Sequence, residues 1–320
     1  MLRQFLAGMA LAIFCTSAIA QSDFPSKSIR FVVPYPPGGF TDILARIIGQ
    51  KLTESLKQAV IVDNKGGGGS IIGTENVARA PADGYTILMV APDFAINESL
   101  YKTLPYNAVS DFAPVTLAAY SPMVLVVNPS FPAKSVKELI QLAKAKPGTI
   151  NYASGGNGTG SHLATEQFKS MAGIDMMHIP YKGNGPATTA LLGGEVSVML
   201  LQMAVAGPHI AAGKLRALAV PGAERSAAMP ELPTIAEAAL PGFSVTPWFG
   251  VVAPAGTPKA AIAKLNSAIA TVMALPEVKE QLTKQGAQAV SSTPEEFAAF
   301  IKTEIPHWAK VVKTSGARVD

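Results

Sequence analysis

Two segments of this chain share one order of features: an apolar strand, a turn rich in glycine, and a helix start. The first runs from Arg30 to Asp42, with Gly38 and Gly39 in its turn, and the second runs from Ile150 to His162. A helix that begins at such a turn presents unpaired backbone N–H groups at the positive end of its dipole. Each segment therefore predicts an anion-binding site that needs no charged side chain.

A small carboxylate is the anion that suits a pair of such turns. A hydrogen bond to an ionised carboxylate contributes roughly 1.5 to 3 kcal/mol, so four bonds would contribute about 6 to 12 kcal/mol before the entropic cost of association. Micromolar binding requires about 8 kcal/mol. Neither turn fits a nucleotide, because no Gly-Lys-Ser/Thr follows and the G-x-G-x-x-G spacing that starts at Gly156 ends on Ser161.

The candidate binding residues lie in these two turns and in two later segments. They are Gly38, Gly39, Phe40, Thr41, Asp42, Ser154, Gly155, Asn157, Gly158, Thr159, Ser161 and His162 in the turns, and Tyr181, Lys182 and Gln202 after them. Asp42 is favoured as an N-terminal helix cap, His162 fits a helical turn as well as a ligand contact, and Lys182 suits a solvated position as well as the cleft. Phe40 predicts a ligand with an apolar or aromatic body.

Motifs for catalysis and metal binding do not occur in the sequence. There is no G-x-S-x-G, no H-E-x-x-H and no cluster of histidine and cysteine with zinc spacing, and the four histidines are spread along the chain. We therefore expect a binding protein that is not an enzyme and has no cofactor and no metal. A catalytic site assembled only in space remains the main alternative of another class.

The first twenty residues have the pattern of a secretory signal peptide. Arg3 precedes a short apolar stretch from Phe5 to Phe14, and Ala18-Ile19-Ala20 predicts cleavage after Ala20. The single cysteine, Cys15, lies inside this segment. We therefore expect a mature periplasmic protein without thiols or disulfides.

Composition favours a well-packed protein with no affinity for nucleic acid. Hydrophobic residues make up 48% of the chain and charged residues 15%, enough apolar surface for one or two large cores. Removing the signal peptide leaves 25 basic and 22 acidic side chains. This small excess is scattered along the chain, whereas nucleic-acid binding requires a concentrated basic stripe.

Strand and helix patterns alternate along the chain, which predicts an α/β fold with largely parallel sheets. The expected strands are 29–34, 60–63, 86–91, 123–128, 150–153, 196–201, 215–220 and 249–253. A helix is expected from about Asp42 to Leu56, and others after Ser135 and Thr293, each of which has a glutamate three residues later. The similar segments 123–129 and 249–254 predict two strands that cross between lobes. The expected lobes are residues 21–124 plus 251–320 and residues 125–250, with one glycine turn in each.

A family resemblance rests on a series of short motifs in fixed order. They are Pro36-Pro37-Gly38-Gly39, Asp63-Asn64-Lys65-Gly66, Ala82-Asp83-Gly84-Tyr85-Thr86, Leu104-Pro105-Tyr106, Asp111-Phe112-Ala113-Pro114-Val115, the turn from Ser154 to His162, Pro180-Tyr181-Lys182-Gly183, Leu232-Pro233-Thr234 and Ala253-Pro254-Ala255-Gly256-Thr257-Pro258. Together they resemble the receptors of the tripartite tricarboxylate transporters, the Bordetella uptake gene (Bug) family. The chain departs from the family pattern at Asn107 and Ser197, where members commonly carry aspartate.

The resemblance implies a two-lobed periplasmic binding protein of the type II-like class, with hinged lobes that close on a carboxylate. It implies that the two glycine turns are the ligand-binding turns, and that the partners are a large and a small membrane subunit of a transporter. We expect the receptor itself to be a monomer. A sensor subunit that presents the loaded ligand to a signalling membrane protein remains an alternative, because its fold and its pocket would be the same.

Overall fold

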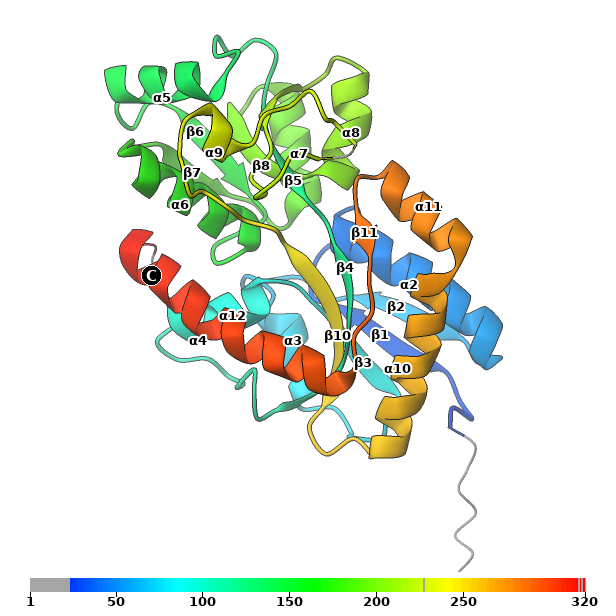
Figure 1. Cartoon of the computed structure of the whole chain (residues 1–320). Helices are drawn as coiled ribbons and strands as arrows, with labels where there is room; N and C mark the ends of the chain where they lie inside the picture. The colour runs from blue at the N-terminus through cyan, green and yellow to red at the C-terminus, as the bar shows by residue number, and fades with distance from the viewer. Residues whose placement is uncertain (1–23, 227, 316, 318, 320) are drawn as a thin grey trace, which may run out of the picture.

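The molecule consists of two lobes, each built around its own β-sheet with helices packed against it (Figure 1). The structure is a computed structural model and describes residues 24–226, 228–315, 317 and 319. The predicted signal peptide, with Cys15, lies outside the described residues. The two sheets confirm the predicted α/β class. The expectation of largely parallel sheets is wrong, because five of the nine strand pairs among the described residues are antiparallel.

The first lobe has a six-stranded sheet in the order β11-β4-β10-β3-β1-β2. Its strands are β1 (Ile29–Val33), β2 (Val60–Asn64), β3 (Thr86–Val90), β4 (Phe112–Tyr120), β10 (Trp248–Pro254) and β11 (Gln288–Ala289). Its helices are α2 (Phe40–Leu56), α3 (Ile71–Ala78), α4 (Asp93–Leu100), α10 (Lys259–Ala274), α11 (Pro276–Lys284) and α12 (Pro294–Ser315). β1 pairs in parallel with β2 and β3, and β10 runs antiparallel to β3 and β4.

The second lobe has a five-stranded sheet in the order β7-β6-β8-β5-β9. Its strands are β5 (Met123–Val127), β6 (Asn151–Ser154), β7 (Met177–Pro180), β8 (Val198–Gln202) and β9 (Arg216–Ala219). Its helices are α5 (Val136–Ala145), α6 (Gly160–Ala172), α7 (Asn184–Gly193), α8 (Met203–Ala211) and α9 (Ile235–Ala238). β6 pairs in parallel with β7 and β8, whereas β5 runs antiparallel to β8 and β9.

The chain passes between the sheets twice. It leaves the first sheet after β4 and enters the second at β5, and it returns between β9 and β10 (Figure 1). The predicted lobe boundaries, at 124/125 and 250/251, fall within β5 and β10, close to these changes of sheet; the exact ranges stay our proposal. Helix α12 packs against α4 of the first lobe and α6 of the second, so it contacts both sides of the hinge.

Local sequence accounts for most of these elements. Leu44, Ile48 and Leu52 form the buried row of α2, as the helical spacing predicts. The helix begins at Phe40 rather than near Asp42, because Gly39 has extended backbone and is the N-cap. Thr293 and Glu296 exchange hydrogen bonds at the start of α12, which confirms the predicted cap.

Three strands are not indicated by the sequence pattern. β4 contains Pro114 and a run of small residues, β7 is a short edge strand that ends on Pro180, and β11 has only two residues. Each of them exists because a neighbouring strand supplies its hydrogen bonds. Among the residues that the structure describes, no single helix is long and apolar enough to cross a membrane; α10 and α11 meet that test only as a bent pair.

Candidate ligand-binding site

A cleft lies between the two lobes and is lined by residues of both. From the first lobe they are Tyr35, Pro36, Gly39, Phe40, Thr41, Ala91, Pro92, Asp93, Pro247 and Phe249. From the second lobe they are Gly155, Thr159, Gly160, Ser161, Asn184 and Gln202. The cleft thus lies where β1, β3, β6, β7 and β8 end and the helices that follow them begin. Such carboxyl ends are the usual ligand position in open α/β sheets.

Five helices begin at this cleft. α2 and α4 start there from the first lobe, and α6, α7 and α8 start there from the second. Each helix start carries about half a positive charge from the aligned peptide dipoles, and each stabilises a nearby anion by typically 0.3–1 kcal/mol. The cleft therefore attracts an anion although none of its described lining residues is lysine, arginine or histidine.

Four backbone amides at the cleft have no acceptor among the described residues. They belong to Phe40 and Thr41 at the start of α2, and to Gly160 and Ser161 at the start of α6. These N–H groups come in one pair from each lobe. A carboxylate placed between them would satisfy donors that otherwise remain unpaired at a helix end.

The hydroxyl groups of the second turn hold its backbone in place. Ser154 Oγ accepts the N–H of Gly156 at 3.1 Å, and Ser161 Oγ accepts the N–H of Gly155 at 3.1 Å. Thr159 Oγ1 donates to the carbonyl of Gly156 at 2.8 Å. The sequence predicted these hydroxyls as ligand donors, but in the structure each one also fixes the turn that carries the free amides.

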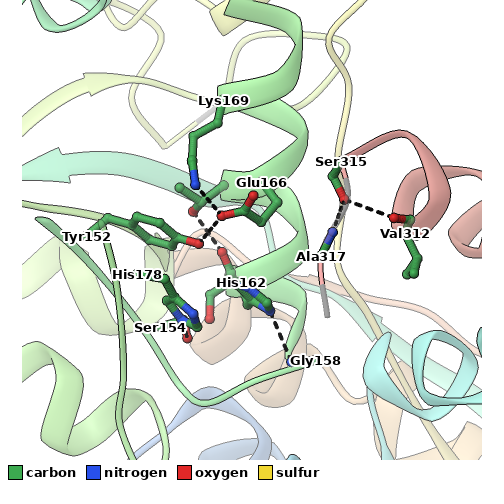
Figure 2. Close-up of polar contacts among 12 residues, drawn as sticks. Tyr152, Ser154, Gly158, His162, Glu166, Lys169, His178, Val312, Ser315 and Ala317 are labelled. Carbon is green, nitrogen blue, oxygen red and sulfur yellow. Dashed lines mark hydrogen bonds and ion pairs between the residues drawn. The ribbon is translucent and has the colours of Figure 1, made fainter. Parts of the chain in front are cut away.

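His162 supports the same turn from the side away from the cleft. Its Nδ1 accepts the N–H of Gly158 at 3.1 Å, and its ring stacks on His178 with centroids 4.0 Å apart (Figure 2). The Nε2 of His178 lies 2.6 Å from Ser154 Oγ. Burial lowers the pKa of His162 to about 4 and that of His178 to about 3. Both imidazoles are therefore neutral at pH 7.

Asp42 holds the backbone of the first turn, as the hydroxyl groups and His162 hold that of the second. Its carboxylate accepts the N–H of Gly38 at 3.1 Å and hydrogen bonds from Arg46 and Asn64. Burial opposes ionisation, but the bonds from Arg46, Asn64 and Gly38 outweigh it and lower the pKa of Asp42. Asp42 lies in the first turn of α2 and does not line the cleft. The N-cap is Gly39, without a side-chain cap bond, so the capping role favoured for Asp42 is wrong, although its carboxylate holds the turn through the N–H of Gly38.

Only part of the predicted set lines the cleft. Gly39, Phe40, Thr41, Gly155, Thr159, Ser161 and Gln202 do so, whereas Gly38, Asp42, Ser154, Asn157, Gly158, His162, Tyr181 and Lys182 do not. Tyr181 and Lys182 line a neighbouring hollow, and Lys182 is exposed. A Cβ on Gly158 would lie 2.6 Å from Cδ2 of Leu100, so this glycine allows the lobes to approach each other.

Sequence reasoning missed several residues of the cleft. Asn184 donates through Nδ2 to Oε1 of Gln202 at 2.6 Å, and the two amides form a polar patch beside Ser161. Asp93 lies in the cleft with Tyr35, whose hydroxyl donates to Oδ1 of Asp93. Both Asp93 and Asn184 stand at helix starts that follow a strand, which is the signal that identified the two glycine turns.

An apolar surface completes the cleft. Phe40 and Phe249 contact each other edge to face, with ring centroids 4.7 Å apart, and Pro92 and Pro247 lie nearby in the same lining. Among the described residues no group of three or more histidine, cysteine, aspartate or glutamate side chains could hold a metal ion. The site thus combines backbone donors, one polar patch and an apolar wall.

The protein has two lobes and a polar cleft between them, at which helices of both lobes begin. This arrangement is that of a periplasmic solute-binding protein. The chain belongs to the tripartite tricarboxylate transporter receptor family, whose model matches residues 44–317. The predicted resemblance to this family, and to its Bug members, is thereby confirmed.

Sequence relatives and solved structures both match nearly the whole chain. The chain is 40% identical to the protein BugT of Bordetella pertussis over 303 residues, which cover 94% of this chain and 93% of BugT. It matches a structure of a Rhodopseudomonas palustris protein with adipate at a TM-score of 0.90 and 36% identity, covering 93% of this chain and 100% of that one. It matches R. palustris MatC with bound malate at a TM-score of 0.87 and 32% identity, covering 90% and 100%.

Proposed function

We propose that this protein is a receptor that captures a small carboxylate between its lobes and delivers it to a membrane transporter. The observation that carries the proposal is the pairing of free amides: Phe40 and Thr41 on one lobe, Gly160 and Ser161 on the other. Four hydrogen bonds to a carboxylate at roughly 1.5 to 3 kcal/mol each are compatible with micromolar affinity. The adipate and malate of the two R. palustris structures support the same ligand chemistry.

The remaining features of the proposal come from the sequence analysis and, for the membrane subunits, from family membership. The partners would be a large and a small membrane subunit, and the receptor would act as a monomer in the periplasm after removal of residues 1–20. Residues 21–124 with 251–320, and residues 125–250, would close as two units on the ligand. The ligand would be released unchanged, because the described lining of the cleft contains no histidine, lysine or cysteine and the described residues form no metal-binding group.

A thermal-shift screen against carboxylic acids tests this function. A ligand present at 100 times its dissociation constant adds about 2.7 kcal/mol to the free energy of unfolding. We expect one or a few acids to raise the melting temperature in proportion to log concentration, and to be recovered chemically unchanged. Absence of a shift with every acid would refute carboxylate capture, and formation of a product would instead indicate an enzyme.

Replacing Gly160 by proline tests the role of the backbone donors. Proline fits the first position of a helix and removes only the N–H group there, and Thr159 already has the extended backbone that must precede proline (φ −68°, ψ 157°). Loss of one hydrogen bond to a carboxylate should weaken binding by about tenfold or more. Isothermal titration calorimetry with the acid identified by the screen measures the change.

Gly160→Ala is the matched control for this variant, because it adds a Cβ but keeps the N–H group. The added Cβ would lie 3.6 Å from the nearest atom of Pro92, an ordinary contact. We expect its affinity to stay close to that of the native protein. Equal losses in Gly160→Pro and Gly160→Ala would show that crowding, rather than the missing donor, weakens binding.

Phe40→Leu tests whether the apolar wall selects the body of the ligand. Phe40 is 1% exposed and contacts Phe249, so leucine keeps an apolar side chain at this position but loses the aromatic contact. We expect benzoate-type acids to lose several-fold more affinity than adipate in this variant. If the native protein binds aromatic and short aliphatic acids with equal affinity, and Phe40→Leu changes neither affinity, Phe40 does not select the body of the ligand.

A further inference from the structure

Two side-chain amides meet in the wall of the cleft on the second lobe. Asn184 is the first residue of α7, Gln202 is the last residue of β8, and both line the cleft. Nδ2 of Asn184 donates to Oε1 of Gln202 at 2.6 Å. Gln202 is only 8% exposed, so this contact is largely shielded from solvent. The pair thus connects the starts of α7 and α8 through side chains.

Helix capping does not explain these two amides. Gln202 is the N-cap of α8 and Gly183 is the N-cap of α7, and neither of these helix starts has a side-chain cap bond. Serine, threonine, aspartate and asparagine are the usual N-caps, because their short side chains reach the first free N–H groups. The amide of Gln202 is directed to Asn184 instead of to the helix that it precedes.

Neighbouring atoms fix the amide of Asn184. A Cβ on Gly155 would lie 2.5 Å from Oδ1 of Asn184, so the glycine at this position leaves room for the amide. The hydroxyl of Ser161 donates to the same oxygen at 3.4 Å. Because Oδ1 lies on that side, Nδ2 of Asn184 faces Gln202. The partner of Gln202 is therefore a donor, which occupies the oxygen of the Gln202 amide and leaves its nitrogen.

The amide nitrogen of Gln202 is available to another molecule. Nε2 has no acceptor among the residues that the structure describes, and it is not one of their fully buried polar atoms that lack a partner. It therefore reaches open space, and the space that Gln202 lines is the cleft. A primary amide nitrogen has two N–H donors and no acceptor. The side chain of Gln202 thus adds donors to a cleft that already has free backbone N–H groups.

We propose that Asn184 is a positioning residue that holds Gln202 with its N–H groups toward the cleft, and that Gln202 donates to an oxygen of the bound acid. The inference rests on the proposed carboxylate capture and adds a side-chain donor to its backbone donors. A glutamine without a fixed partner can present either its oxygen or its nitrogen, and only the nitrogen can bind a carboxylate. The bond from Asn184 removes this ambiguity, because it occupies the oxygen.

Calorimetry at pH 7.5 with adipate, malate and benzoate tests the donor. Gln202→Met keeps the approximate length of the side chain and removes its N–H groups. We expect this variant to bind the preferred acid of the three about tenfold or more weakly, the usual effect of losing a hydrogen bond to a charged group. Thr189→Ala, at an exposed position of α7 outside the cleft lining, is the control and should keep the native affinity. Unchanged affinity in Gln202→Met would overturn the proposal.

A double-mutant cycle tests whether Asn184 acts through Gln202. Asn184→Ala releases Oε1 of Gln202 and should weaken binding several-fold in the native protein. In the Gln202→Met protein the same replacement should change the affinity by less than about twofold, because no glutamine is left to orient. Equal losses in the two proteins would show that Asn184 acts independently, and its positioning role would be wrong.

Asn184→Asp tests the direction of the contact. An ionised aspartate can only accept, so Gln202 must turn its nitrogen toward it and present its oxygen to the cleft. The new charge also repels a carboxylate, and Asn184→Asp in the Gln202→Met protein measures that effect alone. We expect Asn184→Asp to cause a several-fold larger loss of affinity in the native protein than in the Gln202→Met protein. A purely structural amide pair predicts equal losses.

The outcomes distinguish this inference from the function on which it rests. If the native protein binds one of the three acids and the variants show none of the expected losses, the roles of Asn184 and Gln202 are wrong while carboxylate capture stands. If the native protein binds none of the three acids, carboxylate capture fails for all of them and the inference fails with it. Thermal unfolding without acid shows whether each variant is folded.

Discussion

Replacing Gly250 by alanine is expected to lower the free energy of unfolding by about 3 kcal/mol, because the core has no room for a methyl group there. A Cβ on Gly250 would lie 2.2 Å from Cζ of Phe297 and 2.7 Å from its Cε1. Phe297 is fully buried beside Trp248, with ring centroids 5.8 Å apart, so its ring cannot move aside freely. Chemical denaturation of the two proteins measures the difference.

A double-mutant cycle assigns this effect to the ring. Leucine is shorter than phenylalanine. In the Phe297→Leu protein, Gly250→Ala should therefore lower the free energy of unfolding by less than about 1 kcal/mol. Gly207→Ala, in α8, is the matched control, because a Cβ there would meet no atom within 4 Å. Gly207→Ala should be neutral or slightly stabilising. A cost at Gly250 that is the same in both backgrounds would exclude the Phe297 ring as its source.

Lowering the pH from 7 to 5 is expected to reduce the free energy of unfolding. His162 and His178 should each contribute up to about 2 kcal/mol to this loss. Their pKa values lie near 4 and 3 in the folded protein and near 6.5 in the unfolded chain, so the unfolded chain takes up more protons as the pH falls below 6.5. Asp93 acts in the opposite direction, since its raised pKa, about 6, makes the folded state take up its proton first.

Comparison of variants isolates the histidine contribution. The double variant His162→Gln with His178→Gln should lose most of the difference in unfolding free energy between pH 7 and pH 5, although it starts from a lower stability. His307→Gln, at an exposed position of α12, should keep that difference. An undiminished pH dependence in the double variant would place the proton uptake elsewhere.

Protonation of His162 in the folded protein, which requires a pH near its pKa of about 4, should weaken ligand binding. An imidazolium has no lone pair to accept the N–H of Gly158, so charging His162 breaks the bond that holds the second turn. The free amides of Gly160 and Ser161 begin two residues later and depend on that turn for their direction. Affinity should therefore change little between pH 7 and pH 5, and as the pH falls further to about 4 it should fall more in the native protein than in the histidine double variant.

Local patterns explain why the two glycine turns could be predicted from sequence. Strand, turn and helix start follow each other within a dozen or so residues, and the spacing of Leu44, Ile48 and Leu52 specifies the buried face of α2 without reference to distant contacts. The same local pattern precedes Asp93, but the turn there, Ala91-Pro92, contains no glycine.

Contacts between residues far apart in the sequence determine which of the predicted residues line the cleft, and the local pattern does not show them. Lys182 and Asn184 are separated by one residue, yet Asn184 lines the cleft and Lys182 lines the neighbouring hollow. The reason is that Gly183, the N-cap of α7, turns the backbone between them with φ 113°. Ser154 was expected to contact the ligand, but His178, on the adjacent strand β7, occupies its hydroxyl. Such partners are set by strand pairing across the sheet.

The free amides of the cleft also have a consequence for how this family diverges. Every residue except proline supplies a backbone N–H group, so nearly any side-chain replacement at positions 40, 41, 160 and 161 leaves those donors in place. After gene duplication, the side chains that line the cleft can therefore change, and the ligand with them. The backbone N–H groups proposed to bind the carboxylate are inherited unchanged. Overall sequence similarity would then follow the inherited backbone donors, and the side chains that line the cleft would set the ligand.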